Sequence, residues 1–200
     1  AGQGMVGAPL RTDAFAMFKE QKIINNKVIA KGELNVRTLY VTDDDRVDSA
    51  AFVFPFSQIV DVDGVDDGCD CSVKFGVCDM NVNLTESVDG SRSVFEYDFT
   101  LSANAVALRT AETELICDAF NTGFEMTTEL KTAAFEEYTG TVRGTATIKQ
   151  RVAVSEGITD VCDVTGAVRI DTSETVGAVV KLGGGIDLKI LCLDGESEMI

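Results

Sequence analysis

The 200-residue chain contains no histidine and no tryptophan, and its only prolines are Pro9 and Pro55. Histidine is the commonest general base and a frequent zinc ligand. Its absence excludes Ser-His-Asp hydrolases and histidine-ligated metalloproteases within these residues. The sequence also shows no signal peptide and no apolar run of the roughly 18–20 residues that a membrane-spanning helix needs. These absences argue against those two classes of hydrolase and against a membrane-spanning helix.

Positive charge is scarce as well. The 17 Lys and Arg residues stand against 33 Asp and Glu residues, which gives a formal net charge of −16. A chain of this charge repels polyanions, so we expect neither nucleic acid nor a membrane surface among its partners. The six cysteines are too few and too dispersed for a small disulfide scaffold. Their spacing suits reduced thiols, which predicts an intracellular chain.

The residues that are abundant favour β-structure. Val, Ile, Thr and Phe occur in short runs that are separated by clusters of Asp, Gly and Asn, which is typical of strands and turns. Ile24–Val28 predicts a tight hairpin turn, and Val88–Ser91 predicts another one ahead of a long strand over Val94–Leu108. In that strand apolar and polar residues alternate, which predicts an antiparallel sheet with one solvated face. Ala105–Phe120 is the best helical candidate, although the residues around Leu115 are equally compatible with a strand.

The chain contains an internal repeat. Arg11–Val41 and Asp163–Leu193 share their apolar positions at a constant offset of 152 residues, and Gly32 falls on Gly184. Such repeats usually indicate modules in tandem rather than one catalytic scaffold. We therefore expect a mostly β fold of antiparallel, sandwich-like modules in tandem. The first module is expected at residues 1–122 and can lack N-terminal strands, and residues 123–139 form a connection. Residues 140–200 are expected to be the truncated first half of a second repeat. An alternating strand over Thr141–Val154 opens that second repeat.

Part of the first repeat is similar to a known family. Lys27–Asp45 (KVIAKGELNVRTLYVTDDD), followed by Ala51–Val65 (AFVFPFSQIVDVDGV), resembles the SPOCS domain of spore-forming Firmicutes. The most specific piece is Pro55-Phe56-Ser57-Gln58, which leads into Asp61-Val62-Asp63-Gly64. Thr141–Leu193 resembles the opening half of the next such domain. SPOCS domains often precede a LysM domain, but no LysM segment is present, so peptidoglycan binding is not carried over.

The resemblance implies a non-enzymatic, β-rich module that builds or tethers a layer of the bacterial spore envelope: the coat, the exosporium or an appendage. Such proteins are made in the mother-cell cytoplasm and placed on the surface layers of the spore. The implied partners are other spore-envelope proteins or copies of the chain itself, as a homo-oligomer or polymer. Pro55, Phe56, Ser57 and Gln58 are the expected contact point. The alternative is a strand-end bulge in which Ser57 or Gln58 caps free backbone groups.

An acidic loop, Asp61–Gly68, follows Pro55–Gln58 in the sequence. Clustered carboxylates favour hard cations, which makes a calcium site one hypothesis for the loop. The loop departs from the EF-hand pattern, since Val65 holds its fifth position and Ser72 its twelfth. The alternative is a solvated turn in which Gly64 and Gly68 supply positive φ angles. We therefore expect no cofactor, with Ca²⁺ as the alternative. The weak candidate ligands for Ca²⁺ are Asp61, Asp63, Asp66 and Asp67.

The cysteines that lie closest in sequence are Cys69, Cys71 and Cys78. On a strand Cys69 and Cys71 face the same way, while Cys78 has the opposite parity. A structural zinc site needs four ligands, and distant cysteines would have to complete this one. Buried free thiols are the simpler interpretation. A third hypothesis is that these three cysteines, where exposed, crosslink neighbouring subunits of a spore shell.

Three classes of function differ in how well they fit this sequence. A structural assembly protein fits tandem β modules, because exposed sheet edges recruit a strand from a neighbour. A calcium- or carbohydrate-binding surface adhesion module is the alternative. An enzyme is disfavoured, because histidine is absent and the carboxylates are scattered. We therefore expect a structural protein of the spore envelope without enzymatic activity.

Overall fold

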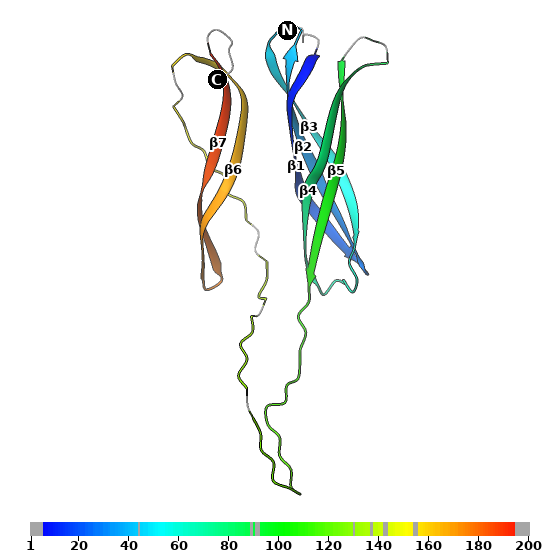
Figure 1. Ribbon diagram of the computed structural model, residues 1–200, viewed down its shortest axis with the longest axis vertical. Helices are drawn as coiled ribbons and strands as arrows, with labels where there is room; N and C mark the ends of the chain where they lie inside the picture. Colours follow the sequence, from blue (N-terminus) through cyan, green and yellow to red (C-terminus); the bar gives the residue numbers. More distant parts are fainter. Residues whose placement is uncertain are drawn as a thin grey trace.

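The computed structural model describes residues 6–43, 45–88, 90, 93–129, 131–136, 138–141, 144–153 and 156–194. Every regular element within these ranges is a β-strand, and the paired strands are antiparallel (Figure 1). The predicted mostly β, antiparallel fold is therefore confirmed. The strands are β1 (Val6–Ile24), β2 (Lys27–Thr42), β3 (Val47–Asp61), β4 (Asp70–Glu86), β5 (Ser93–Leu108), β6 (Ile158–Val176) and β7 (Val179–Asp194).

The first five strands form a sandwich of two sheets. One sheet has the order β1-β2-β3 and the other consists of β4 and β5. Strand β1 lies against β4, and β3 lies against β5. Alternate residues of β2 point into the sandwich, and the buried cluster at one end of it consists of Val28, Ala30, Val65, Cys71 and Val73. Within the described residues, no helix is long and apolar enough to cross a membrane.

Two of the predicted local features are confirmed. A turn at Asn25–Asn26 joins β1 to β2, and Asn26 has a φ of 63°, a conformation that asparagine tolerates better than most residues. Along β5 the alternation of half-buried and exposed residues follows the predicted pattern, with aromatic side chains turned to the other sheet and polar ones to solvent. The β4–β5 hairpin is present, although Asp89 and Ser91 of its predicted turn lie outside the described residues.

Two expectations are wrong. Ala105–Phe120 is not a helix, because β5 continues to Leu108 and residues 109–121 form no regular element. The alternating segment Thr141–Val154 is not a strand where it is described, at residue 141 and residues 144–153, while Val142, Arg143 and Val154 lie outside the described part. Residues 109–120 and 144–153 are exposed, and within the described residues neither stretch pairs with a strand. Neither a short helix nor a single strand is stable without such packing.

The β6–β7 hairpin repeats the geometry of β1–β2. Its strand ends all lie 152 residues after those of β1 and β2. The register shift between Ile170 and Thr172 corresponds to the shift between Phe18 and Glu20. In both hairpins the matching glycine, Gly184 or Gly32, faces the residue just before this shift. The described residues contain no counterpart of β3, β4 or β5 for this second hairpin, which stands beside the sandwich as a two-stranded sheet (Figure 1).

Candidate functional site

The segment Pro55–Gln58 lies in the middle of β3, an edge strand of its sheet. The β2–β3 register is continuous from Lys27–Asp61 to Val41–Val47, so the alternative of a strand-end bulge is wrong. Phe56 lies opposite Gly32, and its ring contacts Phe75 of the other sheet edge to face, with centroids 4.8 Å apart. Phe56 therefore joins the two sheets, while Pro55 cannot donate a ladder hydrogen bond to a strand on either side.

A small hollow of about 250 Å³ lies beside Pro55 and Phe56, next to two ion pairs of the same sheet. Lys19 lies 2.7 Å from Glu33, and Lys31 donates a hydrogen bond of 2.7 Å to Glu20. That hydrogen bond lowers the pKa of the Glu20 carboxyl. Exposed pairs of this kind contribute little to stability. Their effect is to leave this part of the sheet with paired, balanced charges.

An aromatic ladder crosses the open side of the sandwich between β3 and β5. Phe54 contacts Tyr97 and Phe99, at centroid distances of 6.1 and 6.4 Å, and Phe52 contacts Tyr97 at 5.8 Å. Phe52 and Phe54 remain 38% and 39% exposed, because no strand lies beyond β3 and β5 in these sheets. This ladder was not predicted from the sequence, although phenylalanines at every second residue of β3 and aromatic residues at every second residue of β5 were a signal for it.

A chain of hydroxyl groups anchors the ladder to the sheet. Tyr97 shares a hydrogen bond of 2.7 Å with the buried Thr38, and Thr38 shares one of 3.0 Å with Thr12. Burial raises the pKa of Tyr97, and the hydrogen bond to Thr38 partly opposes that rise. The polar end of Tyr97 is thereby satisfied inside the sandwich, which fixes the orientation of the ring within the ladder.

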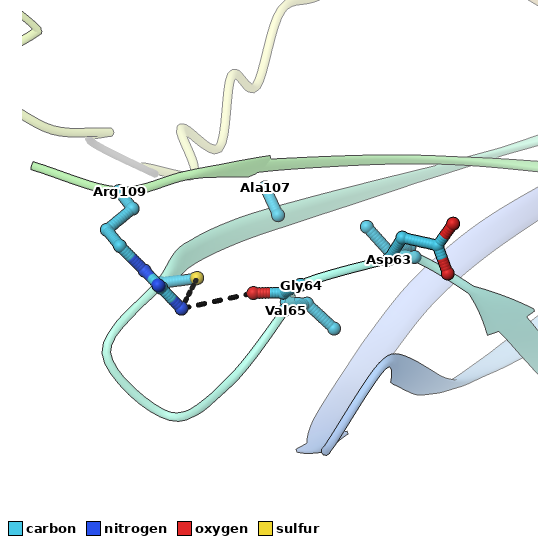
Figure 2. Close-up of a pocket in the computed structure, with 7 residues that line it drawn as sticks. Asp63, Gly64, Val65, Ala107 and Arg109 are labelled. Carbon is cyan, nitrogen blue, oxygen red and sulfur yellow. Dashed lines mark hydrogen bonds between the residues drawn. The ribbon is translucent and has the colours of Figure 1, made fainter.

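The acidic loop between β3 and β4 is organised around Arg109, which follows β5. Figure 2 shows the Arg109 guanidinium directed at the loop, where it donates a hydrogen bond of 3.0 Å to the Gly64 carbonyl. The same group forms an ion pair with Asp66 and lies 3.6 Å from the sulfur of Cys69. Asp66 also accepts a hydrogen bond of 2.9 Å from the Gly68 amide. This hydrogen bond, helped by Arg109, lowers the pKa of the Asp66 carboxyl.

The four candidate calcium ligands do not converge. Asp61 lies 3.3 Å from the ammonium group of Lys27, and Asp66 is engaged by Arg109. The Asp63 carboxylate points away from the guanidinium (Figure 2). Within the described residues, no three His, Cys, Asp or Glu side chains are grouped so that they could hold a metal ion. The positive charge in this loop comes from Arg109, and Gly64, with a φ of 78°, permits the turn.

We expect the Asp66→Asn variant to change how stability depends on pH. The Asp66 pKa is lower in the folded chain than its ordinary value, so its ionised form stabilises the fold above about pH 4, and this contribution disappears as the pH falls through the folded pKa. Unfolding midpoints of both chains, measured from pH 2 to pH 7, should differ at neutral pH and converge in acid. Parallel curves would contradict the assignment.

The cysteines occupy different environments. Cys71 is buried in the core, Cys69 is half-buried at the Arg109 loop, and Cys78 is exposed at the register shift of β4. Cys71 is 4% exposed, so its thiol is not accessible for a crosslink while the chain is folded. Cys117, which the sequence analysis did not single out, is exposed as well. Cys78 and Cys117 are therefore the thiols that a neighbouring subunit can reach.

Brief labelling of the native chain with iodoacetamide should separate these groups. We expect Cys78 and Cys117 to react first, and Cys71 to react only after unfolding, since it is 4% exposed. Burial and the nearby Asp160 carboxylate raise the pKa of Cys162, so this thiol should also react slowly. Peptide mass spectrometry at several labelling times measures each rate. Equal rates at Cys71 and Cys117 would show that the sandwich is open at β4.

A buried carboxylate connects the second hairpin to the sandwich. Asp163 of β6, whose side chain is 5% exposed, lies 2.9 Å from Arg37 of β2 and 4.0 Å from Arg11 of β1. Arg37 also donates a hydrogen bond of 2.9 Å to the Cys162 carbonyl. Asp163 occupies the position in its hairpin that Arg11 occupies in the first one, so the repeat carries opposite charges at matching places. Sequence analysis did not single out this contact.

Comparison with known proteins assigns the first part of the chain. Residues 10–85 match the family model described as SipL, SPOCS domain, from within β1 to near the end of β4. This segment is a SPOCS domain. The SPOCS match covers most of β1, all of β2 and β3 and nearly all of β4, including Pro55–Gln58 and the acidic loop, and it indicates a sporulation-related role. No curated protein and no solved structure matches the chain.

Proposed function

We propose that the chain is a non-enzymatic structural protein of the bacterial spore envelope that acts through protein–protein contacts. The observation that carries this proposal is the SPOCS match over residues 10–85. The absence of histidine and the scattered carboxylates support a non-catalytic role. The protein would be made in the mother-cell cytoplasm and then placed on the spore surface, where other envelope proteins or further copies of the chain are its partners.

We further propose that β6–β7 opens a second SPOCS-type repeat. Support comes from the common 152-residue offset of its strand ends and from the shared register shift. The surface that fits a partner best is β3, whose outward-facing Val53 and Ile59 are 56% and 57% exposed along an edge strand. The calcium alternative gains no support, because Arg109 already neutralises Asp66 in the acidic loop.

A fluorescent fusion of the chain in a spore-forming host tests this proposal. We expect a diffuse signal in the mother cell that becomes a ring around the spore as the envelope forms. A Val53→Glu variant should lose the ring, whereas Ser102→Glu, on the solvated face of β5, should keep it. A fusion that stays diffuse in the wild type would refute the placement on the spore.

A further inference from the structure

We propose that residues 144–153 of one copy of the chain add as a strand to the free edge of β7 in a second copy. This inference deepens the proposed function by naming the partner, a second copy, and the contact. It is based on two unpaired parts of the same chain. One is the β6–β7 hairpin, which has an uncovered apolar face and an open strand edge, and the other is an extended segment with the sequence pattern of a strand.

The acceptor is the face of β6–β7 that corresponds to the core face of β1–β2. Val28, Ala30, Leu34 and Val36 are buried at 0–3% exposure in β2, whereas their counterparts in β7 are 45–61% exposed. From the Thr175–Val180 pair to the Val164–Ile190 pair, register and alternation place twelve residues on this face, and none of them is charged. An apolar, uncharged sheet face with a free edge is an open site for another strand. The β7 counterparts of the four buried β2 residues are Val180, Leu182, Ile186 and Leu188.

The donor is the segment that precedes β6. Residues 144–153 form no strand, and Ile148 and Val152 are 68% and 61% exposed. In the first repeat, the strand that pairs with β2 is β3, and its inward residues opposite β2 are Phe54, Phe56, Gln58 and Val60. The donor segment repeats this two-residue spacing, and its glutamine and valine stand where Gln58 and Val60 stand in β3. Its corresponding residues are Ala146, Ile148, Gln150 and Val152.

This correspondence sets a register. Phe56 lies opposite Gly32 in the first repeat, so Ile148 is placed opposite Gly184, and Val152 opposite Val180. A strand in this register runs antiparallel to β7, as β3 does to β2. It brings the branched side chain of Ile148 next to the glycine, where β7 offers no side chain of its own.

Charge also favours the pairing. Residues 144–153 contain Lys149 and Arg151 and no acidic residue, in a chain whose net charge is −16. The β6–β7 hairpin, residues 158–194, carries six acidic and three basic side chains. Two copies repel each other through their overall charge, and a cationic donor strand reduces that repulsion where they meet.

The strand must come from another copy. Val152 is six residues before the start of β6, so these residues span at most about 22 Å. Val180 pairs with Thr175, seventeen residues along β6 from Ile158, which is about 55 Å at 3.3 Å per residue. The segment therefore cannot reach this register on its own hairpin. Because each copy has one donor and one acceptor on different surfaces, the contact is heterologous and propagates head to tail.

Mixing two defective variants of the full chain tests the proposal by size-exclusion chromatography with light scattering. Ile148→Asp removes the donor and Leu182→Asp removes the acceptor, and both side chains are exposed, so neither change should disturb folding. We expect the wild type to form multimers of the 21.4 kDa chain and each variant to be a monomer. An equimolar mixture should give a one-to-one dimer and no larger species, since only one donor and one acceptor remain.

Matched controls carry the same charge change on the opposite faces. Thr147→Asp and Ala167→Asp should both assemble like the wild type. A monomeric wild type, an Ile148→Asp chain that still assembles, or a mixture without the dimer would each overturn strand donation. None of these results bears on the ring around the spore, so failure of this contact and failure of the proposed function remain distinguishable.

Discussion

The Gly32→Ala variant is expected to lose about 1–3 kcal/mol of unfolding free energy, which is the usual cost of overpacking a core. A Cβ atom at Gly32 would lie 2.5 Å from the Phe56 ring and 2.8 Å from the Met17 carbonyl oxygen. The ring can move, but it then loses its contact with Phe75 in the other sheet. The carbonyl is fixed by the β1–β2 ladder. Urea unfolding of both chains gives the difference.

Gly144 provides the matched control, because a Cβ atom there would meet no atom within 4 Å. Gly144→Ala should unfold at the wild-type urea concentration. Adding Phe56→Leu to Gly32→Ala should recover part of the loss, since a smaller side chain relieves the ring contact and leaves the carbonyl contact. If Gly32→Ala were as stable as Gly144→Ala, the close packing of Phe56 on β2 would be refuted.

The second large effect is expected for Arg37→Met, which removes the main partner of the buried Asp163. Breaking a fully buried ion pair costs about 3–5 kcal/mol, because a charge is left without compensation. Arg37 is 40% exposed, so we expect a smaller loss of about 1–3 kcal/mol in the docking of β6 on the sandwich. Hydrogen exchange should become faster at residues 158–165 and stay unchanged in β4 and β5.

Arg11→Met is the control for this contact, since Arg11 lies farther from Asp163, at 4.0 Å, and is more exposed. Its effect should be clearly smaller than that of Arg37→Met. Combining Arg37→Met with Asp163→Asn should cost less than the sum of the two single changes, because each single change already removes the interaction. Strict additivity, or wild-type exchange rates in Arg37→Met, would show that the ion pair does not dock the hairpin.

Local features of this chain follow from its sequence, whereas contacts between distant segments do not. The turn at Asn25–Asn26 and the alternation along Val94–Leu108 were predictable, because turn chemistry and the two-residue period act between neighbours in the chain. The same period was misleading at Thr141–Val154. At residues 144–153 the pattern of a strand is present, but no strand among the described residues pairs with it, and a lone strand is not stable.

The candidate site shows the same division. Sequence alone singled out Pro55–Gln58 and the acidic loop, but it predicted that the loop is either a solvated turn or a calcium site. The structure adds Arg109, which is 43 residues away from Asp66 and comes beside it through the β4–β5 hairpin. The cysteines also needed the structure, since parity distinguishes Cys71 from Cys78 but does not say which of the two faces is covered.

The sequence by itself determined the β class, the 152-residue repeat and the resemblance to SPOCS domains, because these depend on residue order and short-range periodicity. Only the tertiary structure decided which faces are covered. It placed the aromatic ladder between β3 and β5, put Arg37 against a chain segment 125 residues away, and left the apolar face of β6–β7 open. The reason is physical: burial and ion pairing depend on which strands face each other, and no local pattern encodes that arrangement.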